Sequence, residues 1–197
     1  MINKEKFTLK IMLQKMGLTE QESILLIDKF EEYGFKYERI IKRKNIIYPM
    51  IDYFKKGNYS NKFMNKMISV AIKKYSAKKV LNVDTVLINN NYNIKERENI
   101  EFNNTEIFNQ NKETLEKKLC YYNENNLKQI ILKNPKGLVI SLELSHARIE
   151  LFKRKKLSLY ANVSKLFEDN TKFKYDFGIN SENLKRMYPL PEKYLKK

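Results

Sequence analysis

The residues most able to do chemistry in this chain are lysines and arginines that recur in short runs. Cationic side chains of this kind neutralise phosphates and release counterions, which gives salt-dependent binding with little sequence preference. Arginine adds a planar fork that meets a phosphate with two hydrogen bonds, so Arg43 and Arg154 are the strongest single candidates. The predicted nucleic-acid contacts are Lys42, Arg43, Lys44, Lys55, Lys56, Lys73, Lys74, Lys78, Lys79, Arg148, Lys153, Arg154, Lys155 and Lys156.

The positive charge of the chain is concentrated in two blocks. The 197 residues hold 39 Lys+Arg and 23 Asp+Glu, a formal net charge of +16. Residues 36–80 contain 13 basic and 2 acidic residues, and residues 128–197 contain 16 basic and 7 acidic residues. Low genomic G+C content explains many lysines, but it does not explain why carboxylates are scarce in the first block. Because concentrated like charge destabilises a compact state, the pattern favours a polyanionic partner, DNA or RNA.

Other chemistry has less support in the residue types. With one cysteine, Cys120, the chain forms no internal disulfide, and with one histidine, His146, it is a poor candidate for zinc, haem or histidine-based catalysis. We expect a buried thiol, a structural or ligand-contacting histidine, no cofactor and no catalytic residue. The five glycines are scattered and form no phosphate-binding loop. A metal-dependent nuclease is a weaker alternative, and the carboxylates available to it, which lack a diagnostic spacing, are Asp84, Glu96, Glu98 and Glu101.

The chain shows no signal for a membrane. No apolar run approaches the roughly 20 residues that a membrane-spanning helix needs. The first residues also lack the apolar run of a signal peptide. The sequence therefore predicts a cytoplasmic protein without a membrane partner.

Helical periodicity must supply the scaffold for these cations outside the middle of the chain. The first helix is expected to turn Phe7, Ile11 and Met12 inward, and residues 61–75 have the clearest apolar stripe. Pro49 removes a backbone donor, so we expect two helices around it. The predicted helices cover residues 7–15, 20–33, 37–44, 47–56, 61–75, 105–120, 124–133 and 141–154, followed by two short helices capped by Asn162 and Asn180.

The middle of the chain differs from both ends. Residues 80–88 are rich in β-branched side chains and are compatible with a strand, a short helix or an extended connector. Residues 89–104 are rich in Asn, which favours turns, so we expect a loop there. The prediction is a mainly α multi-helix array with an N-terminal subdomain 1–80, an Asn-rich connector 81–104 and a C-terminal subdomain 105–197, which could pack as one domain.

Several tyrosines lie near basic residues and could stack on nucleic-acid bases, although most of them are more typical of a core or its rim. They are Tyr37, Tyr48, Tyr59, Tyr75, Tyr121, Tyr122 and Tyr160.

The two basic blocks resemble each other. Residues 51–56 align with 149–154 at an offset of 98, and Ser60 then aligns with Ser158, each followed by a helical pattern. Chance similarity between two amphipathic helices that end in lysines is the alternative to a duplication.

Residues 130–190 carry a family resemblance. The apolar segment 130–138 includes Pro135 and Leu138, and it is followed by Ser141-Leu142-Glu143 and by residues 148–153, Arg-Ile-Glu-Leu-Phe-Lys. This pattern resembles the helical repeat of the mitochondrial transcription termination factor family, with Pro189 as the next proline of the pattern. The distance of 54 residues between the two prolines is longer than the family's repeat, and the usual glycine is missing near Lys155. The resemblance implies an α-helical repeat fold with a basic nucleic-acid-binding concavity and no catalysis.

Together these observations predict a non-catalytic nucleic-acid-binding protein that uses basic helical surfaces, such as a regulator from a mobile element or a low-G+C bacterium. The alternative belongs to a different class. A small phage-type or plasmid-type inhibitor or adaptor would bind a host protein or a nucleoprotein complex instead.

Overall fold

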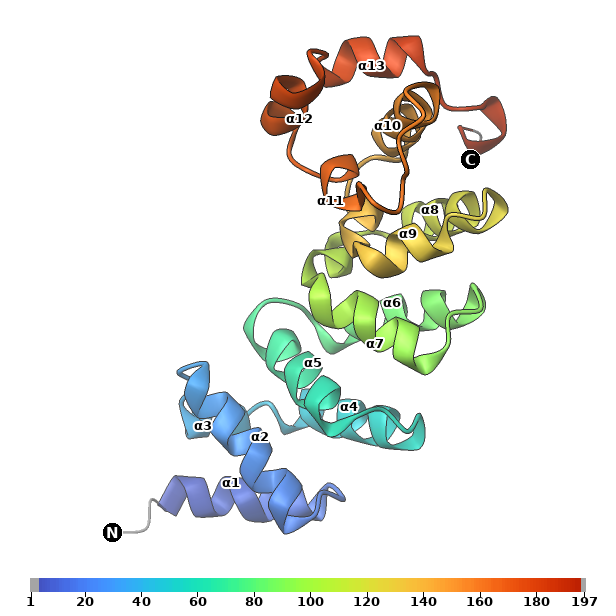
Figure 1. Ribbon diagram of the computed structural model, residues 1–197. Coiled ribbons are helices and arrows are strands. Elements are labelled where there is room, and N and C mark those ends of the chain that lie inside the picture. Colours follow the sequence, from blue (N-terminus) through green and yellow to red (C-terminus); the bar gives the residue numbers. More distant parts are fainter. Residues whose placement is uncertain (1–3, 196–197) are drawn as a thin grey trace. The chain divides into compact units, whose positions relative to one another are not determined.

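The computed structural model describes residues 4–195, which form an all-α fold (Figure 1). Within that range there are thirteen α-helices, three short 3-10 helices and no strand. This confirms the mainly α multi-helix array. The short strand considered for residues 80–88 is wrong, because Val80, Val83, Val86 and Leu87 are buried at the three- and four-residue spacing of one helix face.

The described chain divides into two compact units after Thr85. Unit 1 contains α1 (Lys4–Lys15), α2 (Glu20–Glu32), α3 (Tyr37–Ile41), α4 (Lys44–Lys56), α5 (Asn61–Lys73) and the first part of α6 (Ala77–Asn89). The division falls within the segment predicted as a connector, but α6 runs through it as a continuous helix.

Unit 1 is held together by packing of α1 on α2 and α3, of α2 on α5 and of α4 on α5. At its centre the rings of Phe54, Tyr59 and Phe63 meet with centroids 5.1–5.4 Å apart. The inward face predicted for α1 is wrong, since Leu9 is buried whereas Phe7 is 56% exposed. Two apolar faces of α1 have the same four-residue spacing, so periodicity alone could not choose between them.

Asp84 fixes α6 to the other helices of unit 1. Its carboxylate is fully buried and accepts a hydrogen bond of 2.6 Å from Tyr53 Oη and another from Tyr59 Oη. Because a buried carboxylate is costly unless it is hydrogen-bonded, these two phenols make Asp84 a structural residue. It is therefore a poor candidate for the carboxylate of a nuclease.

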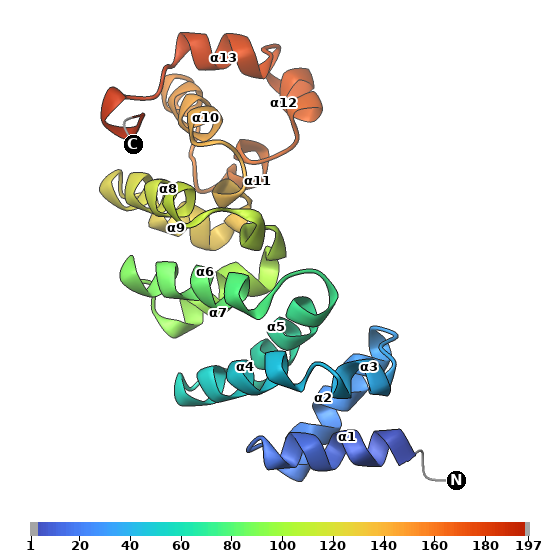
Figure 2. The same cartoon turned by 180° about the vertical axis from the view of Figure 1, so that it is seen from behind.

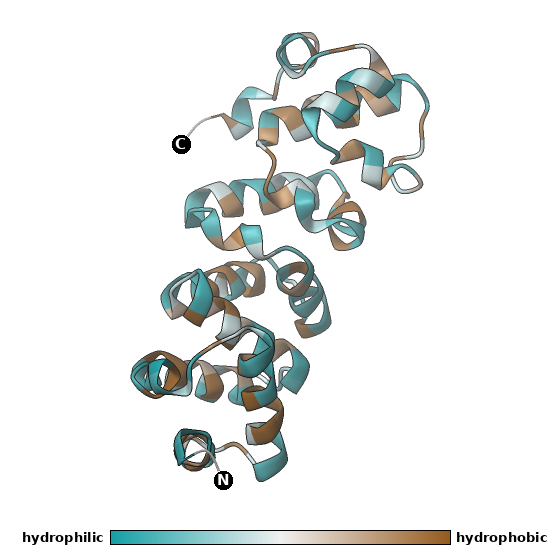
Figure 3. Ribbon diagram, turned by 90° about the vertical axis from the view of Figure 1, so that its left-hand side faces the viewer, coloured by the Kyte–Doolittle hydropathy of each residue, from teal (hydrophilic) through white to brown (hydrophobic). Residues whose placement is uncertain are grey.

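Unit 2 begins with the end of α6 and has more short elements. They are α7 (Ile94–Asn103), η1 (Thr105–Asn109), α8 (Lys112–Glu124), α9 (Lys128–Lys133), η2 (Pro135–Leu138), α10 (Leu142–Arg154), α11 (Val163–Leu166), α12 (Asn170–Phe177), α13 (Ser181–Met187) and η3 (Glu192–Tyr194). The α8 and α9 helices lie side by side, and α10 packs against α11 and α13 (Figures 1 and 2). Hydrophilic and hydrophobic residues are interspersed along the helical ribbon (Figure 3).

The Asn-rich segment is a folded part of unit 2, so the loop predicted over residues 89–104 is wrong. Asn93 caps α7 and forms a capping box with Glu96. Asn99 Nδ2 donates to the Leu132 carbonyl (2.6 Å), and Asn104 Nδ2 donates to the Pro135 carbonyl (2.9 Å). Asparagine favours helix ends because its side chain bonds backbone groups, so a run of asparagines also suits a stack of short helices.

Four helix ends share one turn geometry. Asn58, Asn91, Asn126 and Lys156 adopt left-handed backbone with φ of 56°, 62°, 57° and 55°. The N–H of each following residue donates to the carbonyl five positions earlier, at 3.0, 3.1, 2.7 and 2.9 Å. This is the closure of the Schellman motif. Asn58 and Lys156 are separated by the offset of the internal alignment, although the helix expected after Ser158 is replaced by turns that lead to α11.

Several predicted helix boundaries also shift. Pro49 lies inside α4, and the interruption falls earlier, between Ile41 and Lys44. The helix predicted to begin at Thr105 is divided into the 3-10 helix η1 and α8, which Asn111 caps. In the described range no helix is both long and apolar enough to cross a membrane.

Candidate nucleic-acid interface

In unit 1, a hydrogen bond from Arg43 brings exposed cations from two runs of the sequence together. Arg43 Nη1 donates to the carbonyl of Ile72 at 2.6 Å, which joins the α3–α4 junction to the end of α5. A cation at the end of a helix is favoured by the carbonyls exposed there. The contact brings the run 42–44 next to Lys73 and Lys74, and Lys78 and Lys79 follow on the first turn of α6. We call this group the basic corner: Lys42, Arg43, Lys44, Lys73, Lys74, Lys78 and Lys79.

The basic corner is poor in carboxylates. Glu38 is bound to Lys42 at 2.7 Å, and both side chains of that pair are largely exposed. An exposed pair of this kind contributes little stability and is easily exchanged for another anion. Lys73 and Lys74 have their ammonium groups 5.5 Å and 5.1 Å from the ring centroids of Tyr33 and Tyr75. Lys44, Lys78 and Lys79 are exposed.

Like charge also accumulates farther along α5, where α2 packs on it, although Lys29 there is paired with Glu32. Burial lowers the pKa of Lys66, and the neighbouring charges of Lys29 and Lys62 lower it further. A lysine whose pKa is depressed by other lysines lies in a positive potential. Lys62 lies about 16 Å from Lys73 along α5, so this positive potential is separate from the corner.

Lys55 and Lys56 do not belong to the corner. They lie at the opposite end of α4, about 18 Å from Lys44 for a helix of this length. Lys55 Nζ donates to the Gly17 carbonyl (2.8 Å) and to Glu22 (2.9 Å), while Lys56 pairs with Asp52 at 2.8 Å. Lys55 therefore serves contacts within unit 1, whereas Lys56 forms an exposed pair like that of Lys42 and is separated from the corner by its distance.

The predicted cations of unit 2 gather at the end of α10. Lys153 pairs with Glu150 at 2.7 Å, and Arg154 Nη1 lies 3.4 Å from Tyr188 Oη. Lys155 and Lys156 are exposed in the turn that follows. Together these four residues present a short basic segment, which we call the α10 terminus.

Arg148 is a correction to the predicted interface, because its side chain is fully buried. Nη1 donates to the carbonyls of Leu166 (3.1 Å) and Glu168 (2.7 Å), and Nη2 donates to Asn170 Oδ1 (3.0 Å). Its guanidinium carbon lies 4.0 Å from the ring centroid of Phe173. The residue therefore joins α10 to the α11–α12 segment and cannot contact a nucleic acid in this fold.

The tyrosines separate clearly by exposure. Tyr59, Tyr75, Tyr121 and Tyr122 are buried, and Tyr37 is half-buried. Tyr48 on α4 and Tyr160 after α10 are 53% and 55% exposed, so only these two of the seven present an open ring. Lys133 donates to the Tyr160 carbonyl at 2.8 Å, and its ammonium lies 3.9 Å from the centroid of the Tyr160 ring.

Sequence reasoning missed a polar pocket of about 460 Å³ between α12 and α13. Lys174 and Arg186 line it together with Thr171 and Ser181, and its carboxylate, Glu182, pairs with Lys185 at 2.7 Å. The residue types suit a phosphate, but isolated cations on two short helices give no signal in a search for basic runs.

The remaining candidates hold structural contacts. Among residues 4–195 no group of three or more His, Cys, Asp or Glu is placed to hold a metal ion. Glu96 caps α7 and pairs with Lys128 at 2.7 Å. His146 Nδ1 is hydrogen-bonded to Tyr121 Oη at 2.9 Å, and burial lowers the pKa of the imidazole. The buried thiol predicted for Cys120 is wrong, because the residue is exposed and its Sγ donates to Glu124 at 3.0 Å.

Comparisons with protein families, with curated proteins and with solved structures find no match for this chain.

Proposed function

We propose that this protein binds nucleic acid without catalysis, through phosphate contacts made by the basic corner. The observation that carries the proposal is the Arg43–Ile72 hydrogen bond of 2.6 Å, which joins two separate basic runs into one exposed group. Phosphate oxygens would bind the exposed ammonium groups of Lys44, Lys78 and Lys79, and the remaining N–H groups of Arg43.

The α10 terminus is a second contact in this proposal, with Tyr160 as an aromatic neighbour for an unpaired base. Such binding reads the charge of the backbone and has little sequence preference. On this proposal the protein acts in the cytoplasm. The resemblance of residues 130–190 to a helical-repeat family of nucleic-acid-binding proteins supports the same class of function.

The test is fluorescence anisotropy with labelled 30-nucleotide single strands and duplexes of DNA and RNA, between 50 and 300 mM KCl. Affinity should fall steeply with salt, and K78Q/K79Q should reduce the slope of log K against log salt on duplex DNA by about 1.8, since each phosphate contact contributes about 0.9. K55Q/K56Q is the matched control. It removes the same charge from lysines bound to Glu22 and Asp52, and should leave affinity within about twofold.

Three results would contradict the proposal. They are no binding at 50 mM KCl, equal losses in the two double variants, and metal-dependent cleavage of any of the probes. A pull-down with and without nuclease treatment tests the alternative directly. A defined protein that is retained after nuclease treatment would identify the chain as an inhibitor or adaptor.

A further inference from the structure

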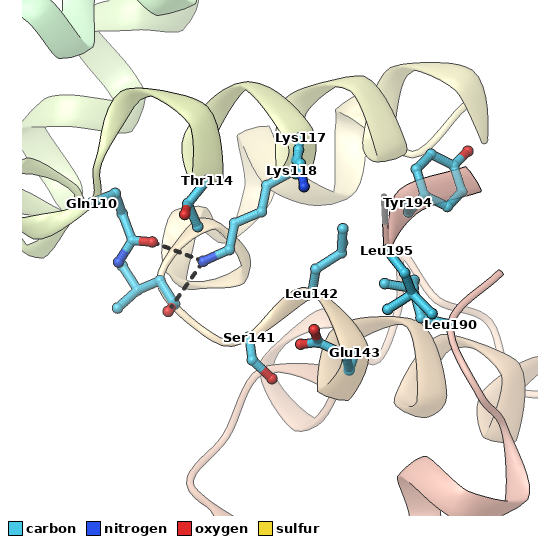
Figure 4. Close-up of a pocket in the computed structure, with 11 residues that line it drawn as sticks. Gln110, Thr114, Lys117, Lys118, Ser141, Leu142, Glu143, Leu190, Tyr194 and Leu195 are labelled. Atoms are coloured by element: carbon cyan, nitrogen blue, oxygen red, sulfur yellow. Dashed lines mark hydrogen bonds between the residues drawn. The ribbon is translucent and has the colours of Figure 1, made fainter. Parts of the chain in front are cut away.

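Unit 2 contains a cavity of about 430 Å³ between α8, the start of α10 and the C-terminal segment around η3 (Figure 4). This volume lies within the range of small-molecule sites, which is about 300–1,000 Å³. Neither the basic corner nor the α10 terminus contributes a lining residue.

One side of the cavity holds a buried lysine. Lys118 is 3% exposed, and its Nζ donates to Gln110 Oε1 at 2.9 Å and to the Leu138 carbonyl at 2.8 Å. The Val139 carbonyl lies at 3.4 Å, beyond the distance of a good hydrogen bond. These three acceptors are neutral oxygens, whereas a buried ammonium group is usually paired with an anion. The site therefore has a positive charge whose bonded partners do not neutralise it.

The other lining residues set the sign and shape of a ligand. Lys117 adds a second cation, and Glu143 is the one carboxylate among the lining residues within 4–195, so these described residues carry two positive charges and one negative charge. Leu142, Leu190 and Leu195 lie across the cavity from the Lys118 ammonium group (Figure 4). A ligand that matches both sides has an acidic group at one end and an apolar tail at the other.

We propose that this cavity binds a small amphiphilic anion, a carboxylate with a short unbranched alkyl tail. The carboxylate lies at Lys117 and Lys118, and the tail lies along the three leucines. Glu143 acts on the buried ammonium group through its charge without being bonded to it, so the anion supplies a hydrogen-bonded counter-charge, and the tail removes leucine surface from water. An amine of the same length is repelled by both lysines and has only Glu143 as a partner.

Isothermal titration of the full chain with octanoate, octanol and octylamine tests this ligand class. Octanoate should bind saturably and at least about tenfold more tightly than octanol, and octylamine should bind most weakly. K117Q should weaken octanoate binding at least about fivefold. K112Q is the matched control, because Lys112 lies on the same helix outside the lining and its side chain is largely exposed.

Glu143→Gln gives a test of opposite sign that does not depend on removing a buried group. It takes away the repulsion of the ligand's carboxylate and should tighten octanoate binding severalfold. Non-saturable binding of octanoate, octylamine binding as tight as octanoate, or equal effects of K117Q and K112Q would each overturn the proposal.

Discussion

Replacing Arg148 by methionine distinguishes two roles for this residue, the phosphate contact that the sequence predicts and the structural contact that the fold shows. As a phosphate contact, Arg148 would be dispensable for folding, and its loss would only weaken nucleic-acid binding. In the structure its guanidinium bonds two backbone carbonyls and Asn170 Oδ1 and covers the ring of Phe173. Burial lowers the pKa of Arg148 to about 10, so the group remains charged at neutral pH.

The cost of Arg148→Met follows from the groups that it leaves behind. Three acceptors, the carbonyls of Leu166 and Glu168 and the Asn170 side chain, lose a charged donor, and the Leu166 carbonyl is left at a buried position. Breaking a buried charged network of this kind costs about 3–5 kcal/mol, and methionine recovers part of the packing. For a chain of this length the melting temperature should fall by roughly 6–20 °C.

Urea and thermal unfolding followed by circular dichroism measure this effect, and Arg154→Met is the matched control. Arg154 lies on the same helix but is exposed, with one contact of 3.4 Å to Tyr188 Oη. Its loss should change the free energy of unfolding by less than about 0.5 kcal/mol. The reasoning is refuted if Arg148→Met costs less than about 1 kcal/mol, or if it weakens nucleic-acid binding while the unfolding curve is unchanged.

Three further predictions concern stability. Burial lowers the pKa of Lys118 from 10.5 to about 8, so the unfolded state binds more protons than the folded state between these two pH values. The free energy of unfolding, measured by urea titration, should therefore rise from pH 8 to about 10, and Lys118→Met should abolish this rise. Above pH 10 the buried tyrosines act in the opposite direction, because burial raises their pKa values. Lys156→Gly should stabilise the chain by about 0.5–1 kcal/mol, because glycine adopts the left-handed backbone at φ 55° without the strain of a lysine. Asn126→Gly should change the melting temperature little, because asparagine tolerates that region. Equal effects of the two variants on the melting temperature would contradict the argument. Gly137→Ala should cost about 1–3 kcal/mol in urea unfolding, since an added Cβ would lie 2.6 Å from Ile131 Cδ1; a neutral effect would show that the neighbours move aside.

The elements with strong local signals could be predicted from the sequence. The capping box at Thr19 and the caps at Ser60, Ser141 and Asn180 all begin helices in the structure. These signals are local, because a side chain bonds an N–H two or three residues away. Which face of a helix is buried depends on its neighbours, and α1 shows how an apolar stripe is left exposed at Phe7.

The middle of the chain could not be predicted for a different reason. Asparagine has one set of preferences that serves loops, caps and left-handed turns alike, so composition alone does not separate them. Asn91, Asn93 and Asn104 take three different roles within one folded segment, as a turn residue, a cap and a cross-link. Only the partners distinguish these roles, and the partner of Asn104 lies 31 residues away.

The candidate site was predictable in outline because charge is visible in sequence, but the role of each cation was not. Lys42, Lys44, Lys78 and Lys79 remain exposed at the basic corner. Arg148 differs from them in its burial and its hydrogen-bond partners, and neither property can be read from a basic residue in the sequence.

Several cations of the chain have a second use of positive charge, which is to satisfy backbone carbonyls. Each helix ends with carbonyls that have no partner within the helix, and a chain with many short helices has many such ends. Lys55 donates to the Gly17 carbonyl, Lys128 to that of Asn91 and Lys133 to that of Tyr160, as Arg43 and Arg148 do elsewhere. A long flexible cation reaches these groups where glycine is scarce, and the chain has five glycines.

Part of the net charge of +16 is therefore explained by the fold, and the part that calls for a polyanion is smaller than the composition suggests. A lysine bonded to a carbonyl keeps its full charge, so it still contributes to the field of the molecule. It cannot turn towards a phosphate without breaking a contact. Neutralising the exposed lysines of the corner should then reduce binding with little loss of stability, whereas neutralising the carbonyl-bound cations, Arg43 among them, should reduce stability first.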